Sequence, residues 1–238
     1  IENGAKFANP LNQAAFSGDL VKLKKMIENG DSVDAENKGE FFISFMPSLG
    51  NSTITPLMAA SYKGNLEVMN YLIQMGANIE STDENGKTPL AWAIINRNKE
   101  AIDLLVKTGV NFEKLYNGTF SPVLIACSLN YPEIVEQLLS YGAKINPEDS
   151  NYNGYICCAI YDSVEVAELL IKKNYPLVVP EYSQGLIFYA AENNSIKVGK
   201  LLIKNKIDIN DTLTYSEETP LFVAVEKNNK EFVELLID

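Results

Sequence analysis

The sequence predicts an all-α solenoid of about seven helix-turn-helix units with short hairpin-like finger loops, built as a single domain over residues 1–238. Three observations predict it. One short motif recurs at a nearly constant spacing, an amphipathic pattern of helical period follows each copy, and turn-forming residues separate the copies. Units of this kind cannot bury an apolar face alone, so they gain a core by stacking.

The recurring motif ends on an alanine. The strings TPLMAA, TPLAWA, SPVLIA and TPLFVA are versions of it, and NPLNQA near the start is a weaker copy. Two further alanines are predicted to take the same place in copies that lack the proline. The predicted repeat centres are Ala14, Ala60, Ala93, Ala126, Ala159, Ala190 and Ala224. Their spacings are 46, 33, 33, 33, 31 and 34 residues, which places seven copies over nearly the whole chain.

Each motif begins as a helix begins. The side-chain oxygen of Thr, Ser or Asn caps a free backbone amide, and the proline that follows suits the first helical position. Small residues come next because this inner helix lies between its neighbours in the stack. Gly18 and Gly64 are predicted to end the helix in a left-handed conformation, with Asn130, Asn194 and Asn228 in that place in later copies.

A second, outer helix is predicted in every copy from apolar residues at i, i+1, i+4 and i+5, a stripe that buries one face. Val68, Met69, Leu72 and Ile73 show the pattern. Glycines that are predicted to end this helix are Gly30, Gly76, Gly109 and Gly142. The chain then returns through a tight turn such as DENG at residues 83–86, which predicts a finger beside each helix pair.

Two regions depart from the pattern. Counted from Ala159, one residue is missing from the turn before Val164, and we expect the copies around Ala159 and Ala190 to be the least regular. The first spacing implies 13 inserted residues in the first finger, at about 36–53. Because this insertion is rich in Phe, either it folds back on the solenoid or it contacts a partner.

The repeat resembles the ankyrin repeat, whose period is about 33 residues and whose signature is T-P-L-H-x-A. The resemblance covers residues 5–238, and five of the seven copies keep the proline. The chain has no histidine. The position after T-P-L holds Met58, Ala91, Leu124 and Phe222. The resemblance therefore implies that apolar packing replaces the hydrogen bonds that the family's histidine makes between fingers.

The resemblance also implies a site, because in ankyrin proteins the partner usually lies on the concave face. That face is formed by the finger tips and the exposed side of the inner helices. The predicted partner-binding residues are Phe16, Tyr62, Lys63, Trp92, Ile95, Asn96, Leu129 and Tyr161, together with Phe42 and Phe45 in the insertion. Aromatic residues on a rigid surface are common anchors of protein interfaces. The alternative is that some of them, Trp92 and Ile95 above all, pack against adjacent inner helices.

Catalytic and metal sites are not predicted. Cys127, Cys157 and Cys158 have no histidine partner, whereas zinc binding needs four spaced ligands and a nucleophile needs a base. A buried structural role is the interpretation, with redox sensing as the alternative. No glycine-rich loop suited to phosphate is present. The sequence thus predicts a protein that is not an enzyme and has no catalytic residue, metal or cofactor.

Charge limits the partners. The chain has 20 basic and 31 acidic residues, a net charge of −11, whereas phosphate binding needs clustered Lys and Arg. No apolar stretch approaches the roughly 20 residues that cross a bilayer. We therefore expect no nucleic acid, no membrane insertion and a monomer. Few cysteines favour a reducing compartment such as the cytoplasm, although the absent initial Met leaves a removed signal peptide as an alternative.

The function predicted from these observations is a protein–protein interaction scaffold or adaptor that binds an unidentified protein in its concave groove. The alternative is the regulatory or substrate-recruiting segment of a longer multidomain enzyme. The lack of an initial Met and an end at Asp238, before a helix-ending glycine, would fit such a fragment.

Overall fold

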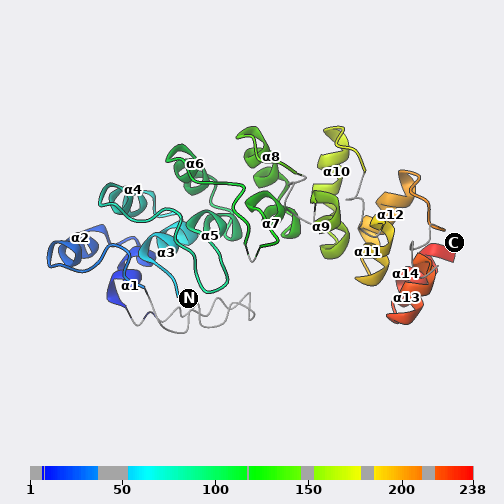
Figure 1. Ribbon diagram of the computed structural model, residues 1–238, viewed down its shortest axis with the longest axis horizontal. Helices are drawn as coiled ribbons and strands as arrows, with labels where there is room; N and C mark the ends of the chain where they lie inside the picture. The colour runs from blue at the N-terminus through cyan, green and yellow to red at the C-terminus, as the bar shows by residue number, and fades with distance from the viewer. Residues whose placement is uncertain are drawn as a thin grey trace. The chain divides into compact units, whose positions relative to one another are not determined.

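In the computed structural model, every regular element over the described residues is a helix, as predicted. The structure describes residues 7, 9–36, 53–116, 118–145, 153–177, 185–210 and 218–237. These residues form fourteen helices in seven consecutive pairs (Figure 1). The chain divides into two compact units, Ile1–Asn117 and Gly118–Asp238.

The first unit contains three helix pairs stacked edge to edge. Its inner helices are α1 (Pro10–Ser17), α3 (Pro56–Lys63) and α5 (Pro89–Ile95), and its outer helices are α2 (Leu20–Glu28), α4 (Leu66–Gln74) and α6 (Lys99–Lys107). Helix α3 packs against both α1 and α5, and α4 packs against both α2 and α6 (Figure 1). Inner and outer helices therefore form two parallel layers.

The second unit repeats this arrangement with four pairs. Its inner helices are α7 (Pro122–Ser128), α9 (Gly154–Tyr161), α11 (Leu186–Glu192) and α13 (Pro220–Glu226), and its outer helices are α8 (Pro132–Ser140), α10 (Val164–Lys172), α12 (Ile196–Lys204) and α14 (Lys230–Ile237). Successive inner helices pack against one another, and so do successive outer helices.

Helix capping follows the prediction in most repeats. The hydroxyls of Thr55, Thr88 and Thr219 each accept a hydrogen bond from the backbone amide three residues later, over 3.2–3.3 Å. Asn9 caps α1 by accepting from the Leu11 amide at 2.8 Å. Ser121 stands at the same position before α7, but its side chain makes no capping hydrogen bond.

The fifth repeat is centred on Cys158, which corrects the prediction of Ala159. In every repeat, the residue before the outer helix donates its amide to the carbonyl of the central residue. Asn65 donates to Ala60 at 3.0 Å, and in the fifth repeat Ser163 donates to Cys158 at 3.1 Å. The prediction that one residue is missing before Val164 is therefore wrong, since the turn has its usual length. Because a buried Cys behaves as a small apolar residue, it can take the place of Ala.

The left-handed residue after each inner helix is also found where predicted, with two additions. Gly18 and Gly64 have φ values of 78° and 75°. The asparagines predicted for later repeats, Asn130, Asn194 and Asn228, have φ values of 56°, 54° and 58°. Arg97 and Asp162 take the same conformation in the two remaining repeats, with φ values of 57° and 52°. The turn after α9 is thus as regular as the others.

Side chains at the start of the outer helices link neighbouring repeats. In the first unit, Asn65 Nδ2 donates to the carbonyls of Ala15 and Phe16 at 2.8 and 2.9 Å. Asn98 Nδ2 donates likewise to the carbonyls of Ser61, at 3.1 Å, and Tyr62. The last carbonyls of a helix have no partner within it, so these bonds satisfy α1 and α3.

The second unit uses a different pair of residues at two of these junctions. Ser163 and Ser195 stand where Asn65 and Asn98 stand, and each hydroxyl lies 3.4 Å from one carbonyl oxygen of the preceding inner helix. The left-handed residue now bonds forward instead. Asn130 Oδ1 accepts from the Val166 amide at 3.2 Å, and Asp162 Oδ1 accepts from the Val198 amide at 2.9 Å. A long side chain at one position thus accompanies a short one at the other.

Apolar residues fill the positions where the family's histidine would stand. Met58 and Leu124 are fully buried, and Ala91 is 2% exposed. Phe222 is different, because it is 51% exposed on α13. The predicted apolar packing therefore holds at the first three of these positions.

We predict that Gly64→Ala lowers the free energy of unfolding more than Gly76→Ala does. Both glycines have positive φ, and an L-residue in that region costs about 1–2 kcal/mol. A Cβ at position 64 would also lie 3.0 Å from Asn98 Oδ1, whereas nothing lies within 4 Å of one at position 76. Urea denaturation of both variants measures the difference. Equal losses would mean that the Asn98 contact adds nothing.

We also predict that Asn98→Ala destabilises the protein by about 1–3 kcal/mol, because it leaves part-buried carbonyls without donors. Asn70→Ala is the matched control. Its Nδ2 donates at 2.9 Å to Leu66 of its own helix, at an exposed position. The same denaturation measurement should find Asn70→Ala close to the wild type. A similar effect of both substitutions would contradict the role of the link between repeats.

Candidate docking surface

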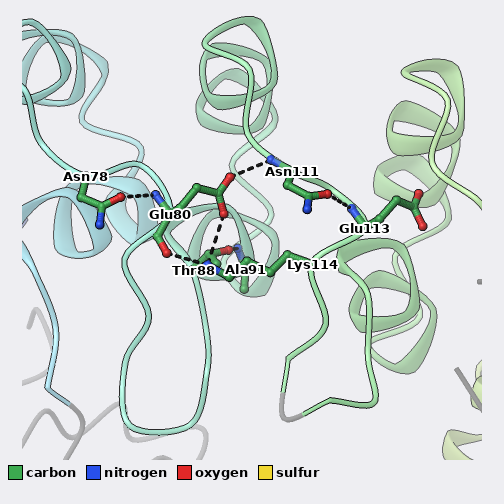
Figure 2. Close-up of polar contacts among 7 residues, drawn as sticks. All are labelled: Asn78, Glu80, Thr88, Ala91, Asn111, Glu113 and Lys114. Carbon is green, nitrogen blue, oxygen red and sulfur yellow. Dashed lines mark hydrogen bonds and ion pairs between the residues drawn. The ribbon is translucent and has the colours of Figure 1, made fainter. Parts of the chain in front are cut away.

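The fingers of the first unit are joined by carboxylates that accept backbone hydrogen bonds from the next finger. Asp34 accepts from the Asn78 amide at 3.1 Å, and Glu80 accepts from the Asn111 amide at 2.7 Å. Lys114 Nζ donates to the backbone carbonyl of Glu80 at 2.7 Å and lies 3.4 Å from the side-chain Oε2 of Glu80 (Figure 2). This side of the unit is therefore fixed by repeated polar contacts.

The second and third fingers are also each turned by an asparagine. Asn78 Oδ1 accepts from the Glu80 amide at 3.0 Å, and Asn111 Oδ1 accepts from the Glu113 amide at 2.9 Å (Figure 2). Because each asparagine orients the acid two residues later, the contact within a finger supports the contact between fingers.

A line of aromatic rings crosses the three inner helices of the first unit. The ring centroids of Phe7 and Phe16 are 5.1 Å apart, and those of Phe16 and Tyr62 are 6.2 Å apart with nearly parallel planes. Tyr62 meets Trp92 at 5.9 Å with an interplanar angle of 79°. Offset and edge-on geometries of this kind add to the burial energy of aromatic pairs.

Most of the predicted partner-binding residues of the first unit gather at this line. Phe16, Tyr62 and Ile95 are half-buried, and Lys63 and Asn96 are exposed. Lys63 Nζ lies 5.0 Å from the centroid of the Phe16 ring, within cation–π range. Asn96 Nδ2 donates to the Tyr62 carbonyl at 2.7 Å. We call these five residues the candidate docking row.

Trp92 does not belong to the surface. It is 1% exposed, so a partner that docks on this structure cannot contact it directly. The alternative interpretation of the sequence, that Trp92 packs against an adjacent inner helix, describes its place. Trp92 lies buried in the middle of α5, and its ring contact with Tyr62 makes it a support of the docking row.

The remaining predicted residues lie elsewhere. Leu129 is half-buried after α7, and Tyr161 is 52% exposed at the end of α9, with its ring 6.5 Å from that of Phe120. With the repeat centred on Cys158, Tyr161 corresponds to Lys63 and not to Tyr62. Phe42 and Phe45 lie outside the described residues, as does nearly all of the insertion at 36–53.

The three cysteines are buried and free. Burial raises the pKa of the Cys127, Cys157 and Cys158 thiols well above the ordinary value, so the reactive thiolate is disfavoured. Among the described residues, no group of three or more His, Cys, Asp or Glu side chains could hold a metal ion. In the same residues, no helix has the length and apolar character needed to cross a membrane.

Sequence reasoning missed one feature of the first unit, a buried ion pair in the finger before α5. Asp83 and Lys87 are each 5% exposed. Asp83 Oδ1 accepts from the amides of Asn85 and Lys87 at 2.9 and 2.8 Å, and Lys87 Nζ lies 3.9 Å from Asp83 Oδ2. Burial raises the pKa of Asp83 and lowers that of Lys87. The turn sequence DENGK carried no signal of this burial, since such residues are usually exposed.

Comparison with known proteins supports the repeat assignment. The family model described as ankyrin repeats in three copies matches residues 11–116 and 155–238, and that of the single ankyrin repeat matches residues 120–150. The crystal structure of the human ASB11 ankyrin repeat domain is similar with a TM-score of 0.72 and 20% identity, and the match covers 96% of this chain and 97% of that one. At this identity the likeness concerns the fold.

Two curated relatives are much longer than this chain. An ankyrin repeat and KH domain-containing protein of Caenorhabditis briggsae is 28% identical over 123 residues, which are 49% of this chain and 4% of the relative. The potassium channel AKT2/3 of Arabidopsis thaliana is 25% identical over 227 residues, which are 94% of this chain and 24% of the channel. Since the family models match most of its length, the chain belongs to the ankyrin repeat family, whose repeats are generally protein–protein interaction modules.

Proposed function

We propose that this chain is a scaffold or adaptor that binds a protein partner through the docking row of its first unit. The observation that carries the proposal is the set of half-buried rings of Phe16 and Tyr62 beside the exposed Lys63 and Asn96. Aromatic rings in such a position offer a large contact area and lose few rotamers on binding. Lys63 adds a cation that an acidic or carbonyl group of a partner would meet.

Rigidity of the row supports this proposal. The Tyr62 backbone carbonyl accepts hydrogen bonds from Asn96 and Asn98 of the next repeat, and its ring rests on Trp92. Two fingers of the same unit are held together by the contacts of Glu80 with Asn111 and Lys114. A surface that is already ordered loses less conformational entropy when it binds, which favours affinity.

The ankyrin fold is typically a non-enzymatic interaction module, and we propose no catalysis by this chain itself. Burial disfavours the thiolate at all three cysteines, which argues against their use as nucleophiles. A second candidate is the regulatory or substrate-recruiting segment of a longer multidomain enzyme. The small share of the curated relatives' length that the chain spans, 4% and 24%, favours a place within a longer protein.

We predict that a photo-reactive amino acid at position 17 cross-links a protein partner, whereas the same group at position 107 does not. Ser17 is exposed beside Phe16, and Lys107 is exposed at the end of the outer helix α6. Mass spectrometry after irradiation in a cell extract identifies the cross-linked protein. Cross-links from position 107 alone would place the partner on the outer helices and contradict the docking row.

The captured protein then allows a quantitative test by calorimetry. Tyr62→Ala should raise its Kd about thirtyfold or more, as expected when a central aromatic anchor worth about 2 kcal/mol is removed. Tyr71→Ala is the matched control, a half-buried tyrosine on the outer helix α4. Circular dichroism confirms that both variants are folded. If Tyr62→Ala binds as the wild type does, the docking row is not the interface.

A further inference from the structure

Lys87 lies where three segments of the first unit meet. Its Nζ is 3.9 Å from Asp83 Oδ2 in its own finger, 4.6 Å from the centroid of the Tyr116 ring in the next finger, and 5.9 Å from that of Trp92 on α5. An ammonium within about 6 Å of a ring centroid is attracted by the negative face of the ring. One buried charge therefore contacts both fingers and the inner helix between them.

Stability alone does not account for this pair. Removing two charges from water costs free energy that a contact of 3.9 Å regains only in part, and Asp83 Oδ2 has no hydrogen-bond partner among the described residues. Both pKa shifts reflect this cost, because burial disfavours the charged form of each group: the pKa of Asp83 is raised and that of Lys87 is lowered. What the pair does provide is a fixed position for the ammonium, since Asp83 is itself held by the amides of the turn.

Trp92 connects the ammonium of Lys87 to the docking row, because it contacts both Lys87 and Tyr62. The indole is buried below the surface, and it contacts the ring of Tyr62 in the docking row at 5.9 Å and edge-on. The interplanar angle of 79° places the edge of one ring against the face of the other. A shift of Trp92 would therefore move or release the Tyr62 ring.

We propose that Lys87 is a positioning residue for the docking row: its ammonium, held by Asp83, fixes the ring of Trp92, and Trp92 fixes the ring of Tyr62. This inference deepens the proposed function and rests on it for its biological meaning. The geometric part is independent of any partner, and it can be tested on the isolated chain.

The test compares three variants of the full chain. Lys87→Met keeps an apolar stem of similar length and removes the charge. Lys87→Arg keeps the charge, and the double variant Asp83→Asn/Lys87→Met removes both charges while the Asn side chain can still accept the two turn hydrogen bonds. Trp92 is the only tryptophan, so its emission and its quenching by acrylamide report on this residue alone. Fluorotyrosine NMR reports on Tyr62, assigned with Tyr62→Phe, and Tyr189 of the second unit is the internal control.

Lys87→Met and the double variant should both shift the Trp92 emission, raise its quenching by acrylamide and move the Tyr62 resonance, while Tyr189 stays in place. Lys87→Arg should keep all three signals close to the wild type. The double variant should melt closer to the wild type than Lys87→Met does, because it buries no unpaired charge. If its spectra also return to those of the wild type, charge balance and not positioning is the role of Lys87, and the proposal is overturned.

Unchanged Trp92 and Tyr62 signals in Lys87→Met would overturn the proposal as well. Should that variant fail to fold, the comparison of Lys87→Arg with the double variant decides by the same signals. Toward the protein captured from position 17, the double variant should lose between about twofold and thirtyfold in affinity, the range for residues that act through a neighbour. If the spectra change while Tyr62→Ala leaves binding intact, the docking function fails and the positioning of Tyr62 by Lys87 stands.

Discussion

The contact between the end of one inner helix and the start of the next outer helix is the constraint on which the stack depends. A single helix pair leaves its last inner carbonyls without partners and one apolar face uncovered. Asn65 and Asn98 supply the missing donors in the first unit, and they do so from the following repeat. The same neighbouring repeat thus covers the apolar face and supplies the hydrogen-bond donors. The first and second repeats are therefore complete only when the next repeat is folded against them.

This contact is formed in different ways in the chain. They differ in the size of the left-handed residue after the inner helix and of the residue that faces it one repeat later. Gly64 leaves room for the Asn98 side chain, because a Cβ there would lie 3.0 Å from its Oδ1. At two junctions of the second unit the left-handed residue carries a side chain and faces a serine; Asp162, for example, faces Ser195 and caps the next outer helix. In both cases the following repeat donates and the preceding repeat accepts, but the principal side chain comes from the following repeat at Asn98 and from the preceding repeat at Asp162. At the last junction both positions carry an asparagine, Asn194 and Asn229, and Asn229 still donates to the carbonyls of Ala191 and Glu192, so a third combination also completes the contact.

Sequence alone predicted the repeat, the capping residues and most of the turn positions, because these depend on local chemistry such as that of Thr55 and Thr88. It failed where one residue type can replace another, since a search for alanine passes over Cys158. The candidate site divides in the same way. The positions of Tyr62, Lys63 and Asn96 at the end of an inner helix were predicted, because the distance from the repeat centre fixes them. The burial of Asp83 and Lys87 was not predicted, and that of Trp92 was predicted only as the alternative, because such burial results from neighbouring repeats and leaves no local pattern.

The acidic character of the chain has a partly structural origin, and this bears on what the docking row recognises. Asp34 and Glu80 accept backbone hydrogen bonds between fingers, and Asp83 Oδ1 accepts two within its own turn. These carboxylates contribute to the net charge of −11, and they also hold neighbouring fingers together. The docking row itself presents two rings, an isoleucine, an amide and a cation. In the proposed function, recognition by this row rests on apolar area and shape together with the Lys63 cation, so net charge is a poor guide to its partner.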